Sequence, residues 1–162
     1  MGQPMSRSQK TGAAAALAIA IAAPAEGLRQ WAYYCPAGIV TVCYGHTGDV
    51  VKGKQYSLAE CKALLDSDMR AAVEQVEHCH PGLPVEVTAS FADATLNMGS
   101  TIACDSRNST AARYLYQGRL IEACNQLPRW NKARVLGAMV ELPGLTKRRL
   151  QERELCLTGA RS

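Results

Sequence analysis

Seven scattered cysteines constrain what this chain can fold into more than any other feature. They lie between residues 35 and 156, and no Cys-x-x-Cys pair occurs, which argues against a zinc ribbon or a thioredoxin-type motif. Cysteines at this density in 162 residues indicate disulfides and an oxidising compartment. Because seven is odd, at most three disulfides can form within the chain and at least one thiol stays free.

Length and composition fit a single globular domain with room for two lobes. The chain is 48% hydrophobic and 20% charged, which is the composition of a folded protein rather than a disordered one. Its net charge of +4 suits an acidic polymer such as a bacterial cell wall or a nucleic acid, and equally an ordinary soluble protein. Composition alone therefore selects no partner.

The N-terminal region has the pattern of an export signal. Arg7 and Lys10 precede a run from Thr11 to Ala25 that carries no charge and consists mostly of alanine. As a helix this run reaches roughly 22 Å, which is short of the ~30 Å hydrocarbon core of a bilayer. A permanent membrane anchor is therefore disfavoured.

Three interpretations of this run stay open. Ala23-Pro24-Ala25 resembles a signal-peptidase site, which would make the segment a removable signal peptide. Alternatively, the segment is uncleaved and held so weakly that it can later leave the membrane. An alanine-rich helix buried in a protein core would show the same composition.

Periodicity and turn residues predict an α+β fold that is mostly α. A β-rich run over Ile39–Tyr44 and a short partner strand over Val50–Tyr56 predict a small sheet. A capping box over Ser57–Glu60 begins a long helix. Helices are expected over residues 26–34, 57–78, 85–98, 109–117, 119–127, 131–142 and 146–156. These elements predict a small sheet-containing lobe, a long linking helix and a helical C-terminal lobe.

Several kinds of site are disfavoured by the sequence. It contains no Gly-x-Ser-x-Gly nucleophile elbow and no phosphate-binding glycine loop. His78 and His80 flank Cys79 and could form a metal cluster by composition, but a solvated helix end explains them better. We therefore expect no metal site and no cofactor.

Glu26, Cys35 and Thr41 form a compact group around the first predicted strand. A glycosidase needs a carboxylic acid that protonates the leaving oxygen, and a second group that handles water or forms a covalent intermediate. On a helix facing the hairpin, Glu26 could be partly buried beside Trp31 or Tyr34, which would keep it protonated. Spacing alone does not establish this role, because a glutamate after an apolar segment is usually a helix-cap charge.

The residues around this group resemble the active-site region of the phage lysozyme family, glycoside hydrolase family 24. Glu26 begins the string Glu26-Gly27-Leu28-Arg29 and is separated by eight residues from Cys35, which is separated by five residues from Thr41; Gly45-His46 follows. Further matches to the family lie at Leu96–Gly99, Ala123–Leu127, Arg129-Trp130, Gly144-Leu145, Arg148-Arg149 and Glu152. The resemblance thus extends from about residue 26 to the end of the chain.

This resemblance implies a lysozyme-like fold and a specific activity. A member of the family would hydrolyse the β-1,4 bond between N-acetylmuramic acid and N-acetylglucosamine in peptidoglycan, as a monomer that binds no nucleic acid. The catalytic residues would be Glu26 as the general acid, with Cys35 and Thr41. The residues expected to bind substrate or support the site are His46, Asn97, Arg148 and Arg149. Of the two arginines, Arg149 is expected to face Glu26, with Arg148 as the alternative.

Cys35 departs from the commonest family pattern, because most members carry Asp at this position and a minority carry Cys. A thiolate can hold a water or attack carbon directly, so water positioning and covalent catalysis both stay open, and with them a retaining or an inverting outcome. Cys35 could also be a structural half-cystine, and Thr41 an ordinary strand residue.

The disulfide pairing follows once the family spacing assigns Cys35 to the cleft as the free thiol. Cys79–Cys104 is the preferred pair because it brackets the unit from Pro81 to Gly99. The pairs Cys43–Cys61 and Cys124–Cys156 are assigned only by elimination.

The N-terminal run also resembles the signal-arrest-release segment of endolysins from many lambda-like phages. Such a segment holds an inactive enzyme on the outer face of the inner membrane until the membrane is depolarised. Residues 1–25 would then be an export segment and residues 26–162 the catalytic domain, with the N-terminus in the cytoplasm and the enzyme in the periplasm. Cleavage after Ala25 would leave Glu26 at a frayed terminus, which favours the uncleaved interpretation.

Two rival functions stay open at this point. A lytic transglycosylase cleaves the same bond without water and can work with a single catalytic acid. A secreted, disulfide-stapled protein could instead recognise the cell wall without catalysis. The presence of Cys35 and Thr41 together with Glu26 favours hydrolysis.

Overall fold

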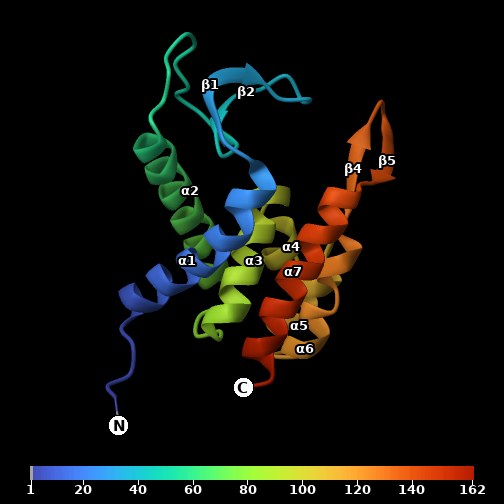
Figure 1. Ribbon diagram of the computed structural model, residues 1–162. Helices are drawn as coiled ribbons and strands as arrows, with labels where there is room; N and C mark the ends of the chain where they lie inside the picture. The colour runs from blue at the N-terminus through green and yellow to red at the C-terminus, as the bar shows by residue number, and fades with distance from the viewer. Residues whose placement is uncertain (1) are drawn as a thin grey trace.

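A computed structural model describes residues 2–162 and shows a β lobe above a larger helical lobe (Figure 1). The elements in chain order are α1 (Arg7–Glu26), β1 (Arg29–Tyr34), β2 (Val40–Cys43), β3 (His46–Thr47), α2 (Leu58–Cys79), α3 (Val85–Met98), α4 (Thr101–Cys104), α5 (Thr110–Tyr116), α6 (Leu120–Cys124), the 3-10 helix η1 (Leu127–Arg129), β4 (Lys132–Val135), β5 (Ala138–Glu141) and α7 (Pro143–Ala160). The α+β, mostly α class is confirmed.

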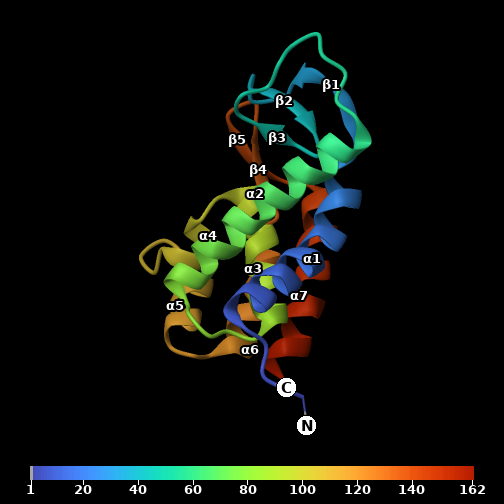
Figure 2. The same cartoon turned by 90° about the vertical axis from the view of Figure 1, so that its left-hand side faces the viewer.

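The long linking helix is also confirmed. Helix α2 runs from the β lobe down along the helical lobe (Figure 2). It begins at the predicted capping box, in which the Ser57 hydroxyl accepts from the Glu60 N–H and the Glu60 carboxylate accepts from the Ser57 N–H. Helix α3 forms the centre of the helical lobe, where it packs against α1, α2 and α7 and buries Phe91 with a row of alanines.

The helix expected over residues 26–34 is wrong. Helix α1 ends at Glu26, and Gly27 adopts a positive φ of 72° that turns the chain into β1. Strand β1 pairs antiparallel with β2, and β2 pairs with β3. The tryptophan and tyrosines of this segment have the aromatic side chains that favour strands, and this preference prevails over the weak helical period. The expected partner strand over residues 50–56 is absent from the described structure, apart from one bridge between Trp31 and Gln55.

The helix expected over residues 131–142 is wrong as well, because these residues form the β4–β5 hairpin. Val135 pairs with Ala138, so Leu136 and Gly137 make a two-residue turn in which both φ angles are positive. Such turns match the twist of a hairpin. The last helix consequently begins at Pro143, three residues earlier than expected, with the proline in the first turn where its missing N–H is not needed.

The alanine-rich run is part of the helical core. Helix α1 buries one face, formed by Ala14, Ala15, Ala18 and Ala22, against α2 and α3. Near its start, the Thr11 hydroxyl donates to the Glu77 carboxylate on α2 at 2.9 Å. Among residues 2–162, no helix is both long and apolar enough to cross a membrane.

Three disulfides join the elements in the pairs that the sequence suggested. Cys43–Cys61 ties the β lobe to the start of α2, Cys79–Cys104 ties the end of α2 to α4, and Cys124–Cys156 ties α6 to α7. All seven cysteines lie in the described part of the chain, and Cys35 is the free thiol.

Candidate active site

The site is centred on an ion pair between the last residue of α1 and a residue on α7. Arg148 Nη1 donates to Glu26 Oε1 at 2.6 Å, although the two residues are 122 positions apart in the sequence. The Glu26 side chain keeps 25% of its surface exposed, whereas that of Arg148 keeps 4%. A reactive carboxyl group is thus open to solvent on one side and held by a buried cation on the other.

The preference for Arg149 as the partner of Glu26 is wrong, and the alternative, Arg148, is confirmed. Arg149 is fully buried and donates to Glu152 on the same helix. Successive residues of a helix point about 100° apart, so only one of two adjacent arginines can face the end of α1.

A fully buried aspartate on α3, Asp93, binds Arg148 on the side opposite Glu26. Arg148 Nε donates to Asp93 Oδ2 at 2.9 Å and Nη2 donates to Asp93 Oδ1 at 2.7 Å. Burial alone would lower the pKa of Arg148, but its hydrogen bonds and charge pairing with Asp93 and Glu26 raise it above its ordinary value. Arg148 is therefore a permanent cation in the site.

A cleft of about 770 Å³ opens beside Glu26. Its lining comes from the end of α1, the loop after β1, α3 and the start of α7, and includes Pro36, Asn97, Leu145 and Arg148. Asn97, which the sequence singled out, has a buried Oδ1 with no hydrogen-bond partner in the described structure. The cleft is large enough for a sugar unit rather than only for solvent.

Gly45 forms the wall against which the Glu26 carboxylate rests. A Cβ at position 45 would lie 2.9 Å from Glu26 Oε2, and Gly45 has a φ of +75°. A glycine is therefore needed at position 45 for two reasons, its positive φ and its close approach to the acid.

The expected apolar neighbours of Glu26 do not cover it. Trp31 and Tyr34 are both exposed, and the Tyr34 hydroxyl accepts from Lys52. The setting of Glu26 is therefore a polar one, between the Arg148 guanidinium and the Gly45 backbone.

Cys35 and Thr41 lie side by side at the end of the β1–β2 pair. Strand pairing sets Tyr33 opposite Thr41, and the Cys35 N–H donates to the Ile39 carbonyl at 3.0 Å. Hydrogen bonding from the Ile39 backbone is the largest influence on the Cys35 thiol, and with the Thr41 hydroxyl it lowers the pKa of Cys35 below its ordinary value. The residue after Cys35, Pro36, lines the cleft.

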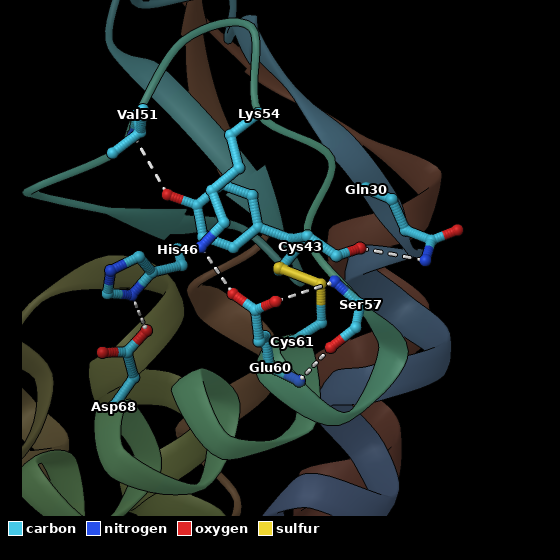
Figure 3. The surroundings of a disulfide bond; sticks show 10 residues. Gln30, Cys43, His46, Val51, Lys54, Ser57, Glu60, Cys61 and Asp68 are labelled. Carbon is cyan, nitrogen blue, oxygen red and sulfur yellow. Dashed lines mark hydrogen bonds and ion pairs between the residues drawn. A yellow bond between two sulfur atoms is a disulfide. The ribbon is translucent and has the colours of Figure 1, made fainter.

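His46 joins the β lobe to α2 instead of facing Glu26 directly. Its Nδ1 lies 2.7 Å from Asp68 Oδ2 (Figure 3), and its Nε2 lies 3.1 Å from the Gly48 carbonyl. The same face of α2 carries the Cys43–Cys61 disulfide. His46 thus supports the position of the strands that carry Thr41.

Sequence reasoning missed Asp93, although a signal was present. Asp93 is the only acid between Val87 and Met98, a stretch of α3 made mostly of small and apolar residues. A lone carboxylate on such a helix must find a buried partner, because an unpaired charge in a core is costly. Its partner lies on α7, however, and the packing of α3 on α7 was not readable from the sequence.

Comparisons with known proteins agree with the geometry. Residues 23–152 match the family model described as Phage lysozyme. The chain is 38% identical over 136 residues to an SAR-endolysin of Bacteriophage PS119, covering 83% of this chain and 77% of that protein, and 37% identical over 136 residues to an SAR-endolysin of Enterobacteria phage P21, covering 83% and 78%. The crystal structure of the active form of the P1 phage endolysin Lyz is similar with a TM-score of 0.76 at 27% identity, covering 88% of this chain and 84% of that one.

Proposed function

Because the chain belongs to the phage lysozyme family, whose members are lysozyme-type hydrolases, we propose that it is an endolysin. In this proposal it hydrolyses the β-1,4 bond between N-acetylmuramic acid and N-acetylglucosamine in peptidoglycan. The observation that carries this proposal is the contact between Glu26 and Arg148 at the edge of an open cleft. A partly exposed carboxyl group with one buried cationic partner is suited to exchanging a proton with a bound sugar.

In this proposal Glu26 is the general acid that protonates the glycosidic oxygen as the bond breaks. Arg148 holds the carboxyl group in one orientation and stabilises its anionic form after the proton has left. Cys35 and Thr41 supply the second function, either by holding the water or by forming a covalent intermediate with the sugar.

The test compares Glu26→Gln with Glu74→Gln, a control in which an exposed glutamate on α2 undergoes the same change. The glutamine keeps the size of Glu26 but cannot donate the acid proton. Clearing of outer-membrane-permeabilised Gram-negative cells should fall by at least ~10²-fold for Glu26→Gln and stay unchanged for Glu74→Gln. More than a tenth of wild-type activity in a folded Glu26→Gln protein would exclude Glu26 as the acid.

We further propose that residues 1–25 export the protein and hold it at the inner membrane, and that residues 11–25 then leave the bilayer without being cleaved and become part of α1 in the periplasmic enzyme. The buried alanine face of α1 supports this idea, because removing the segment would take Ala14, Ala15, Ala18 and Ala22 out of the core. Membership among relatives named SAR-endolysin supports it independently. N-terminal sequencing of the periplasmic enzyme is the test, and a mature protein that begins at Glu26 would contradict it.

A further inference from the structure

We propose that Asp93 is a positioning residue for Glu26: it holds the Arg148 guanidinium in place and balances its charge, so that Glu26 can carry the proton it delivers. This inference rests on the proposed role of Glu26 as the acid. It concerns a residue that does not touch the cleft, because Asp93 is fully buried on α3 and acts only through Arg148.

Asp93 fixes the orientation of the Arg148 guanidinium. Asp93 accepts from both Nε and Nη2 of Arg148, which is a two-point contact on one edge of the planar guanidinium. A contact of this kind prevents the group from rotating about its last bond. The opposite corner, Nη1, then points at Glu26 Oε1 and lies 2.6 Å from it.

Asp93 also balances the charge of Arg148. Arg148 and Asp93 form a buried pair of opposite charges, so Glu26 meets a cation that is already balanced. Without the Asp93 charge, the whole positive charge of Arg148 would act on Glu26. A guanidinium at that distance favours the ionised carboxylate, which has no proton to give.

Other charged groups around this pair do not replace Asp93. Glu152 on α7 contacts Asp93 and pairs with Arg149. Burial, followed by the neighbouring Asp93 carboxylate, raises the pKa of Glu152, which opposes a second negative charge beside Asp93. Lys147 lines the same cleft as Glu26 and adds positive charge there.

The experiment compares Asp93→Asn with Asp66→Asn, a matched control in which an aspartate on α2 loses an exposed pairing with Arg70. The titration midpoint of Glu26 is followed by carboxyl carbon NMR, assigned with Glu26→Gln, alongside the pH–activity profile. For Asp93→Asn we expect the midpoint and the basic limb of the profile to move to lower pH by about one unit, with kcat falling at least ~10-fold at neutral pH. Asp66→Asn should leave both unchanged.

A second pair of variants keeps the test decisive if Asp93→Asn does not fold. Arg148→Met removes the cation, and Asp93→Asn combined with Arg148→Met removes the whole buried pair, which proteins tolerate better than the loss of one partner. The Glu26 midpoint should be lower in the double variant than in Arg148→Met, because the Asp93 charge no longer opposes ionisation.

The outcomes separate this inference from the proposed function. If the Glu26 midpoint is the same in folded Asp93→Asn and wild type, or the same in Arg148→Met and the double variant, then Asp93 is only a structural residue and the inference fails. If Asp93 shifts the midpoint while Glu26→Gln still lyses cells, the positioning is real but Glu26 is not the acid.

Discussion

At the scale of single residues, the site depends on close approaches that leave little tolerance. The Glu26 carboxylate is confined between a guanidinium nitrogen at 2.6 Å and the backbone of Gly45, where a Cβ would come within 2.9 Å of Oε2. A displaced acid loses its reach to the sugar oxygen, and small displacements are expensive in catalysis. The wall at Gly45 can therefore be tested without changing any ionisable group.

Gly45→Ala and Gly53→Ala form a matched pair for that test. Both glycines have positive φ, +75° and +77°, but nothing lies within 4 Å of a Cβ at Gly53. Both substitutions should destabilise the protein by about 1 kcal/mol through backbone strain. Only Gly45→Ala should also lower kcat, by roughly 10-fold or more, because it pushes Glu26 away. Equal kcat values for the two variants, measured on permeabilised cells, would show that the close approach of Gly45 to Glu26 does not affect catalysis.

The Cys35 thiol gives a second prediction at this scale. Its pKa lies below the ordinary value because the Ile39 backbone and the Thr41 hydroxyl stabilise the thiolate, so alkylation by iodoacetamide should accelerate at a lower pH than for an unfolded cysteine. Thr41→Val should move that acceleration to higher pH. In lysis assays Cys35→Asp should stay active and Cys35→Ala should be severely impaired. Normal lysis by Cys35→Ala would remove Cys35 from the reaction.

Several candidate site residues could be named from the sequence alone, and the exceptions have a physical cause. The resemblance to the phage lysozyme pattern singled out Glu26, Cys35 and Thr41 as candidates, and the odd cysteine count required a free thiol, which the structure shows to be Cys35. The choice between Arg148 and Arg149 depends on the rotation of α7, and the role of Asp93 depends on how α3 packs against α7. Neither property is a local feature of the sequence.

At the scale of elements, α2 and α3 were predictable because each has a strong signal at one end, the capping box at Ser57 for α2 and Gly99 for α3. The two errors share a different cause. Residues 26–34 and 131–142 each contain a glycine in the left-handed region, at Gly27 and Gly137, and each glycine turns the chain where a helix was expected. Weak helical periodicity in short segments does not outweigh a turn of this kind.

The β4–β5 turn offers a prediction about stability. Leu136 is fully exposed and adopts a φ of 49°, which a leucine tolerates poorly and an asparagine tolerates well. Leu136→Asn should therefore raise the stability by roughly 0.5–1 kcal/mol, or about 2 °C in Tm. Met139→Asn, at an exposed position within β5, should give no such gain. A fall in Tm for Leu136→Asn in thermal unfolding would contradict the assigned turn.

At the scale of the whole molecule, the proposed release from the membrane places two requirements on α1. It must be apolar enough to enter a bilayer, and small enough along one face to pack against α2 and α3 in water. Alanine meets both requirements, because it forms helices well and allows close packing. The buried alanines lie on one side of α1, and Ala16 and Ala20 lie on the exposed side.

This arrangement allows the two requirements to be separated by mutation. Leucine at the exposed positions, Ala16→Leu with Ala20→Leu, should strengthen membrane retention and delay lysis without disturbing the folded core. Leucine at Ala15 or Ala18 should instead overpack the core and destabilise the released enzyme by about 1–3 kcal/mol. Fractionation of induced cells measures retention, and an unchanged periplasmic fraction for the Ala16→Leu, Ala20→Leu variant would contradict the release mechanism.

The central claim, that this protein is a lysozyme acting through Glu26, is tested most directly by the mass spectrum of the fragments it releases from purified peptidoglycan. Hydrolysis by the proposed route leaves fragments with a reducing N-acetylmuramic acid end, one water heavier than the anhydro fragments of a transglycosylase. We predict reducing muramic ends for the wild-type protein and for Glu74→Gln, and almost no fragments for Glu26→Gln. Anhydro ends from the wild-type protein, or abundant fragments from Glu26→Gln, would contradict the account.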